Sequence, residues 1–320
     1  MKLIEFSRLK TFSLPAFLIC CLLLTSQSCY ESSAHHEVQK FSWEYPPVLT
    51  ATDNLLAHSI DTFFQHRAKK AGLNGSVLVA QNGRVIYQHT FGFLNYFSKE
   101  LLTDSSTFQL ASVTKPFTAT AVLLLHKRKS LNIDDEVAKY IKDFPYKNIT
   151  IRQLLNHRSG LANYIYLFDT LKLAAGSFIT NQDVVNYFVQ HKPALQATPG
   201  HKFQYCNTNY ALLAYIVELV SGQPFKDFLS ENIFIPSHMY HTYVRNVSDT
   251  IKHVNQTIAY TGAHWSRVSD VLYDGVSGDK GIYTTAMDLY LFDQALNHQL
   301  LLDKELLAES YKGYSYEKPG

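Results

Sequence analysis

Hydrophobic positions along this chain predict a helix, then a hairpin, near the start of its folded part. After Asp53, a residue type that caps helices, the apolar side chains Leu56, Ile60 and Phe64 recur at helical spacing. Two extended segments, 76–81 and 84–89, then flank an Asn-Gly dipeptide. A two-residue type I′ turn prefers this dipeptide, so we expect an antiparallel hairpin.

A long apolar helix is predicted directly after the extended segment that ends near residue 110. Pro116 is tolerated only in the first turn of a helix, which places Ser112 at the helix start. Further helices are predicted over 130–136, 149–155 and 209–220 and from Thr285 through Ala295, with Thr285 and Asp288 forming a capping box.

The order of these elements predicts an α/β (α+β) fold with two lobes. Residues 162–262 are mostly helical by periodicity, and sheet is expected to resume after about residue 263. We therefore expect a mixed antiparallel sheet lobe with flanking helices and an inserted helical lobe at about 113–262.

Composition excludes some classes of function. The chain has 320 residues, enough for one large or two modest domains, and 46% of them are hydrophobic. Its net charge is +2, with no basic stripe, so we expect no nucleic-acid partner.

The N-terminus predicts export. Lys2, Arg8 and Lys10 precede an apolar run over residues 12–24 that is too short for a comfortable membrane span. The run ends before Cys29, and a small residue before a lone cysteine resembles the lipobox of bacterial lipoproteins. We expect a signal peptide over 1–29 and a lipid on Cys29, the alternative being ordinary secretory cleavage nearby.

Residues 30–52 are polar and then proline-rich, and predict a tether to a folded domain at 53–320. The expected location is the bacterial cell envelope, as a periplasmic or outer-membrane lipoprotein, with membrane contact only through the lipid. Cys206 is the one cysteine of the folded part, and the histidines include no H-E-x-x-H, so no metal, cofactor or internal disulfide is predicted.

The S-x-x-K pattern offers catalytic chemistry at Ser112. The pattern occurs at Ser7, Ser112, Ser277 and Ser315, and only Ser112 opens a long apolar helix. Residues three apart share a helix face, so a neutral Lys115 amine would reach the Ser112 hydroxyl and take its proton. The alternative for any such pattern is a helix cap with a solvated lysine nearby.

A second pattern, Y-x-N, occurs at Tyr205 and Asn207, directly before the helix predicted over 209–220. It also occurs at Tyr146, so position has to distinguish the two. In isolation, the pattern favours a tyrosine packed under a turn, with Asn207 capping the helix.

Together these segments resemble the penicillin-recognising serine hydrolases, which include class C β-lactamases, D-alanyl-D-alanine carboxypeptidases and related esterases. The resemblance covers about residues 53–320, and the segment 155–161 is similar to the family's L-x-H-x-S-G-L. It implies that Ser112 is the nucleophile and Lys115 its proton partner. It also implies that Tyr205 is a second acid/base group and that Asn207 binds the substrate amide.

The resemblance implies a covalent acyl-enzyme and an amide, lactam or ester substrate, either a small molecule or derived from peptidoglycan. Whether Lys115 or Tyr205 is the base stays open, as does the oligomeric state. This sequence has no K-T-G, and no H-x-G after Lys280, where the family has a third motif. We therefore expect a truncated chain without its closing strands and last helix. The alternative function is a non-catalytic envelope protein that retains the fold.

Overall fold

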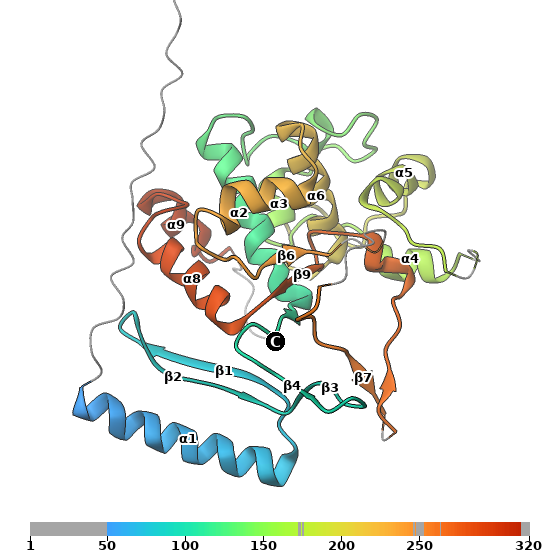
Figure 1. Cartoon of the computed structure of the whole chain (residues 1–320). Helices are drawn as coiled ribbons and strands as arrows, with labels where there is room; N and C mark the ends of the chain where they lie inside the picture. The colour runs from blue at the N-terminus through green and yellow to red at the C-terminus, as the bar shows by residue number, and fades with distance from the viewer. Residues whose placement is uncertain are drawn as a thin grey trace, which may run out of the picture. The chain divides into compact units, whose positions relative to one another are not determined.

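A helix packed on a hairpin opens the folded part of the chain. The computed structural model describes residues 50–171, 174, 176–245, 247, 253–262 and 264–314, which belong to one compact unit, 41–320. Helix α1 (Ala51–Ala71) contacts the hairpin of β1 (Gly75–Gln81) and β2 (Arg84–Phe91) (Figure 1). Thr50 is the N-cap, and Asp53 closes a reciprocal capping box with it, so the helix begins earlier than predicted.

The predicted hairpin is confirmed. Gln81 pairs with Arg84 across the turn, and Asn82 and Gly83 have φ angles of 53° and 71°. A type I′ turn requires positive φ at both central positions, which is why the Asn-Gly pair specifies it.

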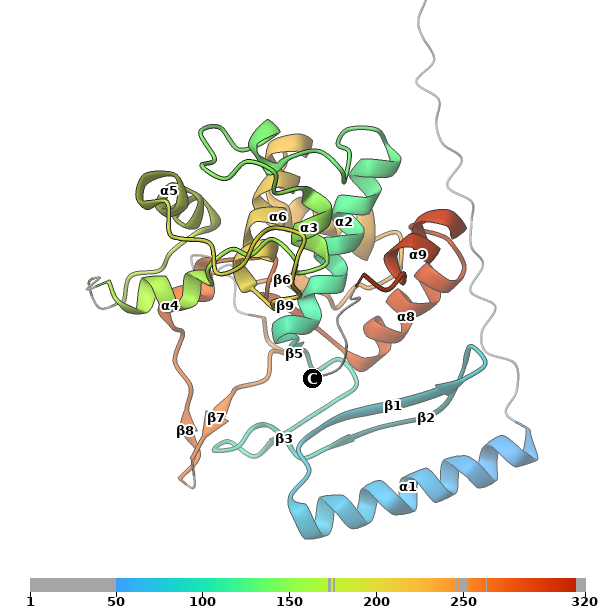
Figure 2. The same cartoon turned by 180° about the vertical axis from the view of Figure 1, so that it is seen from behind.

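The helical part is built around α6 (Asn207–Ser221), which confirms the helix predicted over 209–220. Leu212, Leu213 and Ile216 on α6 are completely buried, and each such burial is worth roughly 1.5–3 kcal/mol. The helices that contact α6 are α2 (Lys115–Lys127), α3 (Ile151–Leu155), α4 (Tyr164–Asp169), α5 (Asn181–His191) and α7 (Phe225–Leu229), which continues into a π-helical turn (Ser230–Phe234) (Figures 1 and 2).

The helix predicted over 130–136 does not form. The Asn132 side chain accepts the Asp134 N–H, and the Asp135 carboxylate accepts the Asn132 N–H. Such side-chain bonds to the backbone compete with a helix, so the segment forms turns and a single 3-10 turn at Val137–Lys139.

Short antiparallel sheets complete the unit. The central one has the order β5 (Phe108–Gln109), β9 (Ile282–Thr284), β6 (Tyr243–Val244). Strand β6 lies inside the range predicted to be helical, because it pairs with a strand far along the sequence. The remaining strands are β3 (Phe93–Asn95) with β4 (Glu100–Leu101) and β7 (Tyr260–Thr261) with β8 (Ser266–Arg267).

Two helices follow β9, α8 (Ala286–Asn297) and α9 (Lys304–Ser310), and α8 contacts β1. Thr285 caps α8 as predicted, but the Asp288 carboxylate accepts the Thr242 hydroxyl and the His241 N–H instead of completing a box. Of the helices in the described residues, none has the length and apolar character to cross a membrane.

Candidate active site

Ser112 lies in the bend between β5 and α2. A 3-10 turn, Ala111–Thr114, joins the two, so Ser112 precedes the α-helix proper by one turn, and Pro116 is the second residue of α2. The residue before the serine, Ala111, has a φ of 45°, which is uncommon for any residue other than glycine. Such strain is typical of functional turns, and here it orients the serine at the helix entrance.

Lys115 brings a buried amine to that serine. Its Nζ donates to Ser112 Oγ at 3.2 Å, to Asn207 Oδ1 at 3.0 Å and to the backbone oxygen of Asp279 at 3.0 Å. Only 5% of Lys115 is exposed. The amine is therefore held in place by three segments that are far apart in the sequence.

Tyr205 approaches the serine from the other side. Its hydroxyl donates to Ser112 Oγ at 2.7 Å, and its ring centroid lies 4.8 Å from Lys115 Nζ. Cys206, the next residue, points into the core, where its Sγ donates to the Leu161 carbonyl.

The fold thus brings Ser112, Lys115, Tyr205 and Asn207 into one cluster. The other Y-x-N lies elsewhere, since the Tyr146 hydroxyl donates to the carbonyl of Pro193. Ser7 and Ser315 of the competing S-x-x-K patterns, and the predicted lipidation site Cys29, lie outside the described residues.

The loop 275–281 is a third segment of the site. Its Gly278 has a φ of 97°, and a Cβ there would collide with the Tyr210 carbonyl oxygen and with Ala214 on α6. The Gly278 carbonyl accepts the Thr118 hydroxyl at 2.8 Å. This close approach delivers the Asp279 carbonyl to Lys115. The glycines were visible in the sequence, but a backbone acceptor carries no residue-type signal.

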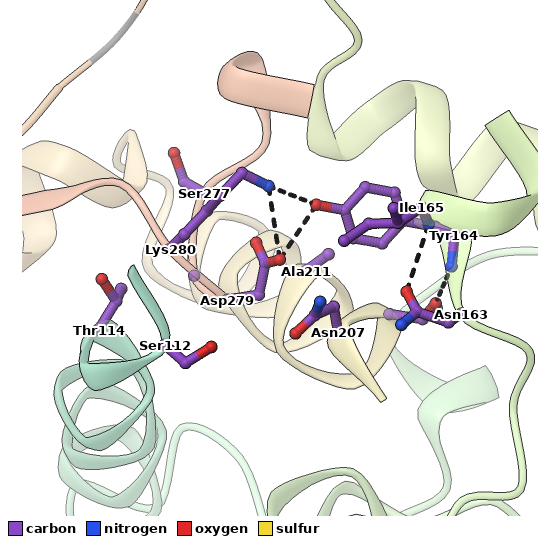
Figure 3. Close-up of polar contacts among 12 residues, drawn as sticks. Ser112, Thr114, Asn163, Tyr164, Ile165, Asn207, Ala211, Ser277, Asp279 and Lys280 are labelled. Carbon is purple, nitrogen blue, oxygen red and sulfur yellow. Dashed lines mark hydrogen bonds and ion pairs between the residues drawn. The ribbon is translucent and has the colours of Figure 1, made fainter. Parts of the chain in front are cut away.

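The same loop buries a charge beside the site (Figure 3). Asp279 Oδ2 accepts the Tyr164 hydroxyl at 3.0 Å and lies 3.5 Å from Lys280 Nζ, which itself donates to the Tyr164 oxygen at 2.6 Å. Burial raises the pKa of the Asp279 carboxyl, although Lys280 and Lys115 act against this. Lys280 therefore points to Tyr164 and Asp279, not to Ser277 of its own S-x-x-K.

His157, in the segment 155–161, lies behind Tyr205. The ring centroids are 4.6 Å apart, and His157 is 8% exposed. Burial, together with the Lys115 charge, lowers the pKa of His157 to about 4, so the ring is neutral near pH 7.

Comparison with known proteins places the chain in a family. A family model described as "Beta-lactamase" matches residues 60–319. The chain belongs to this family, the β-lactamase and transpeptidase-like serine hydrolases. Its sequence is 35% identical over 261 residues to penicillin-binding protein 4* of Bacillus subtilis (strain 168), covering 77% of this chain and 57% of that protein.

Solved structures of the family share the fold. A penicillin-binding protein from Bacillus halodurans matches with a TM-score of 0.66 and 24% identity over 76% of this chain and 75% of that one. A D-amino acid amidase from Ochrobactrum anthropi matches with a TM-score of 0.63 and 26% identity over 77% and 70%. This β-lactamase-family chain spans between 39% and 59% of the length of the first curated relatives it matches.

Proposed function

We propose that this β-lactamase-family chain is a serine hydrolase of the bacterial cell envelope that acts through a covalent acyl-enzyme. The proposal rests on one observation. Ser112 Oγ accepts a hydrogen bond from the Lys115 amine, at 3.2 Å, and another from the Tyr205 hydroxyl, at 2.7 Å. A nucleophile with proton-transfer groups on two sides is the arrangement that acyl transfer needs.

The contacts of Lys115 favour it as the group that accepts the serine proton. Asn207 Oδ1 and the Asp279 carbonyl oxygen are acceptors only, so they take two N–H groups of the amine. Ser112 is the one of the amine's three neighbours that has a proton to give, so in the proposed step the Nζ lone pair takes the place of the N–H that the amine directs at Ser112 Oγ.

In the proposed reaction, Ser112 Oγ forms a bond to the carbonyl carbon of an amide, lactam or ester while its proton passes to Lys115. The Ser112 N–H supplies one donor to the resulting oxyanion. Tyr205 then protonates the leaving amine or alcohol as the carbonyl–leaving-group bond breaks. Attack by water, with its proton returned through the same groups, releases the acid and restores Ser112.

The names of the relatives indicate the substrate class. Penicillin-binding proteins and a D-amino acid amidase are among the matches, so we propose D-alanyl peptides of peptidoglycan, β-lactams or small amides and esters as substrates. An exported protein fits such substrates, and we retain the signal peptide and the lipid on Cys29 as part of the proposal.

Covalent labelling tests the function. Purified protein is treated with a fluorescent penicillin and, separately, a fluorophosphonate. We expect the wild type to be labelled, Ser112→Ala to be unlabelled, and Lys115→Ala to be labelled at least roughly a hundredfold more slowly, since general base catalysis contributes about 10²–10⁴-fold. Equal labelling of all three proteins would show that Ser112 is not the nucleophile. No labelling of the folded wild type would favour the alternative function, a non-catalytic envelope protein that retains the fold.

A further inference from the structure

We propose that His157 is a positioning residue that sets the Tyr205 hydroxyl against Ser112 by holding the chain on both sides of the tyrosine. This inference rests on the proposed function. Gln204 donates its N–H to the His157 backbone oxygen at 2.8 Å, and Cys206 donates its N–H to His157 Nδ1 at 3.3 Å. Tyr205 is thus bracketed by two hydrogen bonds to a single residue.

The two hydrogen bonds matter because Tyr205 lies outside regular secondary structure. Tyr205 is 48% exposed, and its flanking residues form no helix or strand until α6 begins at Asn207. The His157 ring lies against the Tyr205 ring, with the centroids 4.6 Å apart, and the Tyr210 ring centroid lies 5.1 Å from that of the same histidine. An unrestrained half-exposed side chain would sample several rotamers, and few of them place the hydroxyl at Ser112.

The surrounding hydrogen bonds determine which nitrogen of His157 accepts. A backbone N–H can only donate, so the Cys206 contact requires an unprotonated Nδ1. The side-chain amide of Asn209 also donates to Nδ1, at 3.2 Å, while its oxygen accepts the Ser159 hydroxyl at 2.6 Å. Ser159 in turn accepts the Leu161 N–H at 3.1 Å, so its proton is left for Asn209. The network therefore specifies the neutral Nε2–H tautomer, and the lowered pKa of His157 maintains it near pH 7.

The backbone of His157 is left-handed. Its φ is 57°, a conformation in which asparagine, aspartate and histidine are enriched over most other residues.

Two substitutions separate positioning from general stability. His157→Asn keeps an acceptor at the place of Nδ1 and suits the positive φ, whereas His157→Gln moves its acceptor one bond further out. We expect the Asn variant to acylate within about threefold of wild type and the Gln variant to lose about 10–100-fold in kcat, with KM less affected, as for a misplaced catalytic group. Thermal melts of both variants exclude unfolding at the assay temperature.

A double-mutant cycle tests whether the loss passes through Tyr205. If His157 acts by positioning that hydroxyl, adding His157→Gln to Tyr205→Phe lowers the rate by no more than about twofold beyond Tyr205→Phe alone. Multiplicative losses in the double variant, or equal rates for the Asn and Gln variants, would overturn the proposal.

A readout independent of catalysis distinguishes this inference from the proposed function. Nitrogen-15 chemical shifts of the His157 ring are expected to report a protonated Nε2 and a bare Nδ1 at pH 7, and the Nδ1-protonated tautomer would contradict the bracket. If Ser112 is never labelled while this tautomer is found, the proposed function fails and the bracket stands. If Ser112 is labelled but His157 carries its proton on Nδ1, the proposed function stands and the positioning role of His157 fails.

Discussion

Two loops hold Lys115 and Ser112, and they do so by different chemistry. The first, which carries Tyr205 and ends at Asn207, the first residue of α6, contributes side chains and is held by a neutral histidine. The loop 275–281 contributes a backbone carbonyl, that of Asp279, and is held by a tight glycine and a buried charge.

The two loops differ in whether their contribution depends on residue type. Proton transfer needs particular functional groups, so the first loop depends on which residues it contains. Orientation of an amine needs only an acceptor at the right place, and a backbone carbonyl meets that need whatever the side chain. Substitutions in the first loop should therefore lower the reaction rate by removing functional groups. Substitutions in the second loop should lower the stability of the fold.

The largest effect is expected at Gly278. Gly278→Ala combines a φ of 97° with a collision against the Tyr210 carbonyl, so we expect about 3 kcal/mol or more of lost unfolding free energy, together with slower labelling. Denaturant unfolding measures the loss. Gly222→Ala is the matched control, because Gly222 has a φ of 70° and nothing lies within 4 Å of the position that an alanine methyl would take, so backbone strain alone should cost about 1–2 kcal/mol. Equal losses would mean that the close approach to α6 is unimportant.

An intermediate effect is expected at Lys280. Lys280→Met removes the cation beside a carboxylate that is only 2% exposed, so we expect a loss of about 2–4 kcal/mol in unfolding free energy. Adding Asp279→Asn should recover most of it, because the buried charge is gone, and should preserve labelling, because the backbone carbonyl is kept.

The control for this ion pair is Lys139→Met, which breaks the exposed pair with Asp135. That pair is screened by solvent, so a much smaller change is expected. If Lys280→Met and Lys139→Met were equally mild, the second loop would not depend on its buried charge.

The smallest effect is a loss of stability at acid pH that arises from His157, which holds the first loop. The pKa of His157 is lowered to about 4 from an ordinary 6.5, so between these pH values the unfolded chain binds a proton that the folded chain does not. Stability is unaffected above pH 6.5 and falls as the pH drops toward 4, by up to roughly 2–3 kcal/mol.

Unfolding free energies measured at pH 7 and pH 4 test this, with His157→Asn as the reference, because asparagine does not titrate. The wild type should lose more stability than the variant over this interval. Parallel pH profiles would show that His157 is not held neutral by its surroundings.

Much of this arrangement was predictable from local sequence. The Asn82-Gly83 turn requires positive φ, and the apolar period of α6 specifies its buried face, so both elements were predicted correctly. Ser112 with Lys115, and Tyr205 with Asn207, were proposed because the order of the segments resembles a known family; each short motif by itself left a structural alternative open. The predicted helix over 130–136 was wrong because side-chain bonds to the backbone outweighed the helical period.

The sequence alone determined which groups are available near Ser112, because residue type and short spacing decide chemistry within one turn of chain. Only the tertiary structure decided how Lys115 is held, because Asn207 and Asp279 lie 92 and 164 residues away from it. The roles of the Asp279 carbonyl and of His157 Nδ1 depend on packing between distant segments. Every residue has a backbone oxygen, and the tautomer of a histidine depends on the groups around it. The sequence therefore indicates neither the role of the Asp279 carbonyl nor the tautomer of His157.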